Sequence, residues 1–356
     1  MKTKKIYSLY LLLVILMTML LVFACGGGDS GSGAGSDDDG DVDLNPVYST
    51  AYQFTDSAEG IDFNLRYVPK GKFQIDKNGN STSGPIITMT ITRGFCISET
   101  EITQELWEAV MIVSENQLNP SYFNGSTGYE PDGVEEQGKR PVEWMSWYDA
   151  LEFCNILSEK AGRDKVYTFY GDIDRSSNLT NHEGLIEYIY NVVADNTKNG
   201  YRLPTEIEWM WAAMGADVGN EGKLNTTGYL KAFAGSTGSN EFKLYAWGGA
   251  AAASNGNGKT HQVALLEPNE LNLYDMSGNV EEWCWDRQGL TLTYDSNGES
   301  NYSGPAEQVG GFHYRIIRGG SYTLANAVSF KVGNRNIKMA GERSYSNGFR
   351  IVRNAD

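Results

Sequence analysis

Histidine is scarce in the 356-residue chain. It occurs only at His182, His261 and His313, which are widely separated. A common type of non-haem iron site needs two histidines and a carboxylate that converge on one face. The sequence therefore predicts no such iron site. We place His182 in an insertion and His261 in a surface loop.

Cysteine is also scarce, and its distribution limits the redox chemistry available. Cys25 ends an N-terminal apolar run, and only Cys96, Cys154 and Cys284 follow it. Three thiols cannot all pair, and each adjoins an apolar or aromatic residue. This pattern favours buried free thiols. One disulfide is the alternative, because an exported location would permit it.

Positive charge is in deficit. The chain has 29 lysines and arginines against 45 acidic residues, a formal net charge of −16. Removal of residues 1–24 would strip three lysines and no acids. Such a balance argues against nucleic acid and anionic lipid head groups as partners.

The N-terminus carries a targeting pattern. Three lysines precede an apolar run over residues 6–24, and Cys25 is followed by three glycines. A positive region, an apolar region and a small residue before the cleavage point describe a secretory signal. Residues 22–25, VFAC, resemble a bacterial lipobox, in which Cys25 would be lipidated. An uncleaved membrane-spanning helix is the alternative. Residues 25–47 are rich in Gly, Ser and Asp and predict a flexible tether.

Residues 48–356 are expected to form one domain, because no linker or internal repeat interrupts them. Alternating apolar residues over 64–75, around Pro69 to Gly71, predict a strand, a turn and a strand. Residues 86–97 have the same character. Helices are expected to start at Thr103, at residue 147 after the capping pair Ser146 and Asp149, and at Thr205.

The stretch 274–286, YDMSGNVEEWCWD, mixes large aromatic residues with carboxylates around a glycine turn. This mixture suits a buried loop better than a simple amphipathic element. Asn279 and Glu282, with the backbone at Val280, offer some of the oxygen ligands that Ca²⁺ prefers. The alternative is a structural loop whose polar groups satisfy its own backbone.

These residues also resemble the GNVWEW signature of the formylglycine-generating enzyme family, also called the sulfatase-modifying factor family. Further blocks agree in order: TQELW at 103–107, RPVE at 140–143, SWYDA at 146–150, YRLPTE at 201–206, RGGS at 318–321 and GFR at 348–350. The resemblance implies an α+β, C-type-lectin-like fold, loop-rich with few short helices and strands. It also implies a structural Ca²⁺ at the 279–282 loop. Glu281 departs from the family's Trp there.

The same resemblance bears on catalysis. Family enzymes use copper held by two cysteines shortly after the RGGS block, and soft thiolates suit Cu(I). The corresponding positions here are Leu324 and Ser329, and no cysteine follows Cys284. We therefore expect no copper and no oxidase chemistry. An oxidoreductase of the family type with altered metal ligands is the alternative.

The C-terminal segment instead resembles the variable region of lipoproteins altered by diversity-generating retroelements, of the Treponema variable protein type. RGGS opens the segment, Asn334-Arg335 divides it and GFR closes it. The polar and aromatic residues between these blocks suit an adaptable binding surface. The residues expected to bind ligand are Tyr322, Thr323, Leu324, Val328, Ser329, Asn336, Ile337, Lys338, Met339, Glu342, Ser344, Tyr345 and Ser346.

Together these features predict an exported lipoprotein anchored to the bacterial cell envelope, at the outer membrane or cell surface, and facing either the periplasm or the cell exterior. Its domain would present residues 322–346 to an unidentified protein or other macromolecule, and its membrane contact would come through the lipid on Cys25. Ordinary loop exterior is the alternative interpretation of the segment.

Overall fold

The computed structural model describes residues 53–77, 84–112, 119–126, 130–170, 191–249, 255–289, 300–304 and 313–355. Every described residue belongs to one compact unit, Leu44–Asp356. The expected signal peptide, Cys25 and the tether therefore lie outside the described residues. Within the described part, no helix combines the length and apolar character needed to cross a membrane.

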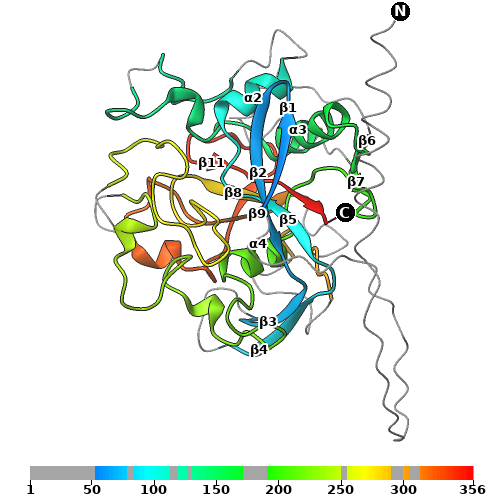
Figure 1. Cartoon of the computed structure of the whole chain (residues 1–356), viewed down its shortest axis with the longest axis vertical. Coiled ribbons are helices and arrows are strands. Elements are labelled where there is room, and N and C mark those ends of the chain that lie inside the picture. Colours follow the sequence, from blue (N-terminus) through cyan, green and yellow to red (C-terminus); the bar gives the residue numbers. More distant parts are fainter. Residues whose placement is uncertain are drawn as a thin grey trace, which may run out of the picture. The chain divides into compact units, whose positions relative to one another are not determined.

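The first and last strands of the domain share an antiparallel sheet. Its order is β1 (Gln53–Ala58), β2 (Ile61–Val68), β5 (Phe95–Ser98) and β12 (Val352–Asn354). β12 pairs with β5 through Arg353 opposite Cys96. The sheet thus closes the domain by joining its two ends (Figure 1).

A second sheet carries the C-terminal segment. Its order is β10 (Asn336–Met339), β9 (Tyr314–Arg318), β8 (Glu281–Arg287) and β11 (Asn347–Gly348), with β11 parallel to β8. The chain that carries the expected binding residues therefore leaves the sheet after β9, re-enters it as β10 and leaves it again before β11.

Two hairpins complete the strands: β3 (Gly71–Asp76) with β4 (Ile86–Ile91), and β6 (Tyr167–Tyr170) with β7 (Asn191–Ala194). The strands expected around Pro69 to Gly71 are present, but β2 and β3 do not pair with each other. Gly71 instead lies against Trp211, where an added Cβ would stand 2.3 Å from the ring. The break at Pro69 therefore directs the chain into a separate sheet.

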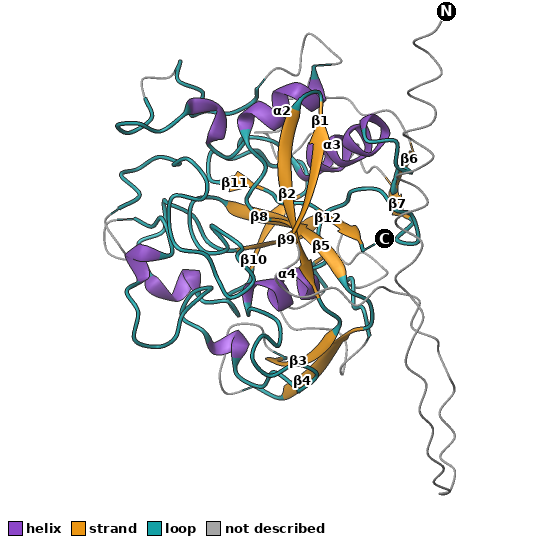
Figure 2. Cartoon of the chain, in the orientation of Figure 1, coloured by secondary structure: helices purple, strands orange, loops and turns teal. Residues whose placement is uncertain are grey.

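The helices begin where their caps predict. They are α2 (Gln104–Met111), α3 (Trp147–Lys160) and α4 (Glu206–Ala213). Ser146 with Asp149 and Thr205 with Glu208 each form a complete capping box, in which each side chain accepts a backbone N–H of the other residue. Figure 2 shows how much loop connects these elements. The short 3-10 helices are η1 (Gln137–Lys139), η2 (Gly228–Leu230), η3 (Phe242–Leu244) and η4 (Ala327–Phe330).

Two buried clusters form the core. One lies between α2, α3 and the first sheet and includes Trp107, Trp147 and Trp283, whereas the other surrounds α4 and includes Trp209 and Trp211. Arginines enter this apolar interior only with carboxylate partners or aromatic rings. Arg202, for example, binds Glu208 through two contacts of 2.6 and 2.7 Å. The RLPTE block therefore has the structural role of starting α4 around a buried ion pair.

Candidate ligand-binding surface

Buried arginines fix the C-terminal segment at three points. Arg318, from RGGS, and Arg335 both bind Oε1 of Glu206, a buried residue of α4. Arg350, from GFR, binds Glu282 through contacts of 2.7 and 2.8 Å. Breaking a buried ion pair by removing one partner leaves an uncompensated charge, which is costly. The backbone between these points is therefore held in place.

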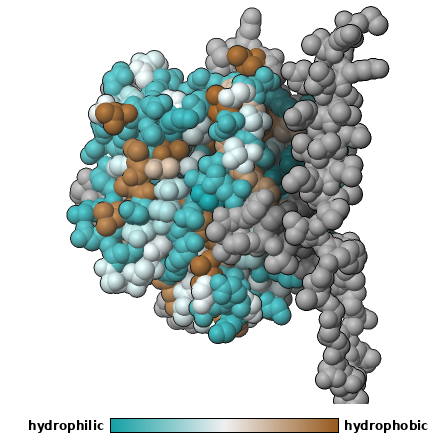
Figure 3. All heavy atoms as spheres, viewed as in Figure 1, coloured by the Kyte–Doolittle hydropathy of each residue, from teal (hydrophilic) through white to brown (hydrophobic). Residues whose placement is uncertain are grey.

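The side chains between the anchors are mostly accessible. Of the thirteen residues expected to bind ligand, all but Tyr322 and Ser346 are at least partly exposed. The exposed ones are Thr323, Val328, Asn336, Glu342 and Tyr345, and the partly exposed ones are Leu324, Ser329, Ile337, Lys338, Met339 and Ser344. On the face seen in Figure 3, the described surface is largely hydrophilic, with hydrophobic residues in separate groups.

Tyr345 belongs to an aromatic cluster with Tyr122 and Trp144. The three ring centroids lie 5.9 to 6.0 Å apart, and each residue keeps between 37% and 46% of its surface exposed. Aromatic rings supply large, rigid contact area at a low cost in conformational entropy. We call Tyr122, Trp144 and Tyr345 the aromatic patch. It is the most distinctive apolar feature beside the segment.

Buried groups beneath the aromatic patch position it. Phe123 packs edge-on against Tyr322, at 5.5 Å, and the carboxylate of Glu143 accepts the backbone N–H groups of Tyr122 and Phe123. Burial raises the pKa of Glu143 to about 8. Trp144 has a φ of 63°, an uncommon conformation for a bulky residue, and its N–H donates to the Ser344 carbonyl.

The sequence did not reveal Tyr122 or Trp144 as surface residues. They are distant in the chain from Tyr345, and nothing in their local pattern distinguishes them from core aromatics. The positive φ of Trp144 is a useful signal, because strained backbone clusters at ligand contacts, but it is visible only in the structure.

A polar group lies along β10. Asn336 donates to Glu281 Oε1 at 3.1 Å, and Lys338 lies 3.4 Å from Glu281 Oε2 and also contacts Asn347. Ile337, between them, packs against the second core cluster. The alternation of a strand thus presents Asn336 and Lys338 on one face and turns Ile337 inward.

The structure joins only part of the expected set. Tyr322 is linked to Tyr345 by a long hydrogen bond to its carbonyl, 3.5 Å, and Lys338 reaches Ser346 at the same distance. Val328 and Ser329 lie on η4, and no described contact joins them to the aromatic patch. The surface therefore consists of the Tyr322 to Tyr345 region with its β10 neighbours, and of a separate η4 edge.

The positions that correspond to the family's copper cysteines hold no thiol ligand. Leu324 lies partly exposed in the loop after RGGS, and Ser329 lies on η4. Cys96, Cys154 and Cys284 are free and buried, which confirms the expectation of buried thiols. They lie in β5, α3 and β8, and Cys284 belongs to a different core cluster from the other two. Burial raises the pKa of the Cys154 and Cys284 thiols.

The expected calcium residues lie close together, but their oxygens already have partners. Glu282 Oε2 accepts from Trp209 Nε1 and Arg350 Nε, and its Oε1 accepts from Arg350 Nη2. Asn279 Oδ1 accepts the His261 N–H, while its amide group and the Val280 N–H donate to Glu101. Glu282 therefore does not fit the role of a calcium ligand. Calcium stays a prediction that would rely on Asn279 and backbone carbonyls such as that of Val280.

Residues 64–355 match the family described as "Sulfatase-modifying factor enzyme 1-like domain". The solved structure of Treponema denticola variable protein 1 is similar, with 33% identity, a TM-score of 0.65, and coverage of 85% of this chain and 99% of that one. "Chaperone protein LppX" of Paenibacillus barcinonensis is 32% identical over 62% of this chain and 71% of its own length. "Formylglycine-generating enzyme" of Streptomyces coelicolor is 30% identical over 44% of this chain, and the match spans 48% of that enzyme.

Proposed function

The chain belongs to the sulfatase-modifying factor enzyme 1-like family, and we propose that it is a binding member of that family rather than a catalytic one. The fold is α+β and C-type-lectin-like, loop-rich, with short helices and strands. In this proposal the fold acts as a rigid support for residues 322–346, which contact a protein or other macromolecular ligand.

One observation carries the proposal: exposed side chains are held between fully buried anchors. Arg318, Arg335 and Arg350 fix the backbone, while eleven of the thirteen residues expected to bind ligand, which lie between them, are at least partly exposed. Pre-organised surfaces bind well because little ordering remains to be done on association. The aromatic patch supports a protein ligand, since Tyr and Trp are the residue types enriched at such interfaces.

The similar solved structure supports the same reading. Its name describes a variable protein, and its whole length matches this chain at 33% identity. We extend that description to this chain as a proposal: the exposed residues within 322–346 vary between copies of the gene, while Arg318, Arg335 and Arg350 stay constant. Sequences of the locus from one population would test it. Differences spread evenly over the domain would contradict it.

We further propose that the protein is exported and held at the bacterial envelope by a lipid on Cys25. The VFAC sequence and the preceding lysine-rich and apolar regions support this. Cys25→Ser should leave the precursor uncleaved and unlipidated, as read by mass and by detergent partitioning. Processing identical to that of the native chain would contradict the lipid anchor.

Metal analysis separates this function from oxidase chemistry. The full-length protein would be loaded with Cu(I), and a cysteine-containing sulfatase peptide would be offered as substrate. We expect no stoichiometric copper and no change in peptide mass, because Leu324 offers no ligand and the Ser329 hydroxyl is a hard one. Tightly bound copper together with oxidation of the peptide would overturn the binding proposal.

A further inference from the structure

His261 is buried, contrary to the expectation of a surface histidine. It retains 1% of its surface, and the ring of Trp247 stacks on it at a centroid distance of 3.9 Å and an interplanar angle of 16°. Its Nε2 has no hydrogen-bond partner in the structure, so Nδ1 makes the polar contacts of the ring. The stacked indole restrains the plane of the imidazole ring.

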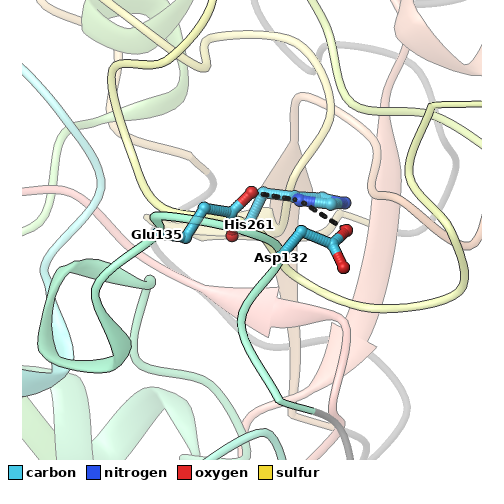
Figure 4. Close-up of side chains that lie close together, drawn as sticks. All are labelled: Asp132, Glu135 and His261. Carbon is cyan, nitrogen blue, oxygen red and sulfur yellow. Dashed lines mark hydrogen bonds and ion pairs between the residues drawn. The ribbon is translucent and has the colours of Figure 1, made fainter.

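Two carboxylates from another loop face this nitrogen (Figure 4). Glu135 Oε1 lies 2.9 Å from His261 Nδ1, and Asp132 Oδ2 lies 3.9 Å from it. One ligand atom from each of the three residues falls within 4.8 Å of the others. A carboxylate oxygen cannot donate, so a proton or a metal ion must lie between Nδ1 and the acids.

Small movements would bring the three ligand atoms to metal-binding distances. With metal–ligand bonds of about 2.0–2.2 Å in tetrahedral geometry, neighbouring ligand atoms stand roughly 3.3–3.6 Å apart. The His261 to Glu135 separation, 2.9 Å, must widen by about half an ångström, and the His261 to Asp132 separation, 3.9 Å, must shorten by about as much. The Asp132 side chain is 47% exposed and is therefore free to adjust.

The charges also favour a dication. Two carboxylates meet one imidazole, and the nearest cation, Lys259, lies 2.7 Å from Oδ1 of Asp132, the oxygen other than the one nearer His261. Lys259 can stay in place, while Asn257, which donates to Oδ2 at 3.3 Å, has to shift. One imidazole nitrogen and two carboxylate oxygens form a ligand set that suits Zn²⁺ and related ions.

We propose that His261, Glu135 and Asp132 form a binding site for a divalent transition-metal ion of the zinc class. Three protein ligands leave at least one coordination position for water or for a donor atom of a bound molecule. The ion would fasten the loop around residues 130–136 to the loop around residues 257–263. Asn279 links His261 to Tyr322, a buried residue beneath the aromatic patch: its Oδ1 accepts the His261 N–H and its backbone carbonyl accepts the Tyr322 N–H.

The test is a calorimetric titration of Zn²⁺ into the metal-stripped full-length protein in detergent. We expect one saturable equivalent. Glu135→Gln should weaken the binding at least tenfold, because an amide oxygen replaces a charged ligand, and His261→Gln should abolish it. The matched control is Glu136→Gln, which removes the same charge from the next residue, an exposed one, and should leave the affinity unchanged.

Cobalt provides a second readout that does not depend on affinity alone. Co²⁺ bound to the native protein should show visible d–d absorption that is lost in Glu135→Gln, a conservative variant in a surface loop whose folding is checked by circular dichroism. Absence of a saturable equivalent would overturn the proposal. So would Zn²⁺ binding that is equal in the native protein and in both Glu135→Gln and His261→Gln.

Discussion

The carboxylates under the C-terminal segment and those beside His261 are placed in different ways. Glu206 and Glu282 are fully buried, and arginine guanidinium groups hold them. Asp132 is half-exposed and pairs with Lys259, Glu135 is nearly buried, and both face the His261 imidazole. A hydrogen bond from Lys259 holds the pKa of Asp132 below its usual value. The first group is paired with buried guanidinium groups. The oxygens of the second accept hydrogen bonds from Lys259, Asn257, His261 and the Gln262 N–H, some of which a metal ion would replace.

The largest effect is expected when a buried ion pair, Glu282 with Arg350, is broken. Glu282→Gln should destabilise the protein by about 3–5 kcal/mol, because the buried Arg350 would lose the carboxylate that binds its Nε and Nη2. Chemical denaturation measures the change. The control is Glu241→Gln, whose pair with Lys243 is mostly exposed and should contribute less than ~0.5 kcal/mol. Equal losses in the two variants would show that the buried pair is not special.

The second prediction concerns the pH dependence of Glu143. Its folded pKa, about 8, lies above its ordinary value of 4.5, chiefly because of burial. The folded state therefore binds more protons than the unfolded state between these values, so stability is full below pH 4.5 and falls as pH rises through 8. Each pKa unit corresponds to about 1.4 kcal/mol, which makes the loss a few kcal/mol.

Glu143→Gln cannot ionise, so it should flatten the stability–pH curve above pH 5. The variant has its own constant cost, since an amide replaces an acceptor of two backbone N–H groups. The slope, rather than the absolute stability, is the relevant measurement. Parallel curves for the native protein and the variant would rule out the raised pKa of Glu143. Asp275, whose pKa burial raises to about 6, contributes in the same direction in both proteins.

A smaller effect is expected in the aromatic patch. Tyr345→Ala removes two ring contacts of 5.9 and 6.0 Å from a half-exposed position. Aromatic pairs contribute ~0.5–1.5 kcal/mol, so the melting temperature should fall by only a few degrees. Tyr345→Phe, which keeps the ring, should restore it. A global loss of folding in Tyr345→Ala would assign the ring to the core rather than to a surface.

The smallest effect is expected at the η4 edge. Val328→Thr changes a residue that is 49% exposed, and its stability should remain within ~0.5 kcal/mol of the native value. The same measurement on Val332, which is 1% exposed, provides the contrast: Val332→Thr places a hydroxyl in the second core cluster and should cost more. Comparable losses of stability in the two variants would mean that the segment does not separate into buried structural residues and exposed residues available to a ligand.

Local features were readable from the sequence, and long-range ones were not. The capping boxes at Ser146 and Thr205 depend on residues three apart, so the starts of α3 and α4 could be predicted. The partner of β3 is β4 rather than β2, and that choice depends on packing against Trp211. Alternation identifies a strand but says nothing of its neighbour.

The candidate site shows the same division. The ordered blocks indicated residues 322–346, and most of the residues named there are accessible. Tyr122 and Trp144 were missed because only the folded chain brings them to Tyr345. Glu135 and His261 are 126 positions apart, which is outside any short metal-binding motif. Glu282 was predicted to be a calcium ligand from its spacing after Asn279, and its arginine partner, 68 positions away in the chain, could not be read from the sequence.

The three buried guanidinium groups have a consequence for evolution of the segment. Arg318, Arg335 and Arg350 each reach a carboxylate on an element outside the spans between them, α4 or β8. An inserted or deleted residue in either span would draw an arginine off its carboxylate or force the chain to bulge. Substitution leaves these attachments untouched. The side chains of such a surface can be substituted freely, whereas the number of residues between the arginines must stay constant.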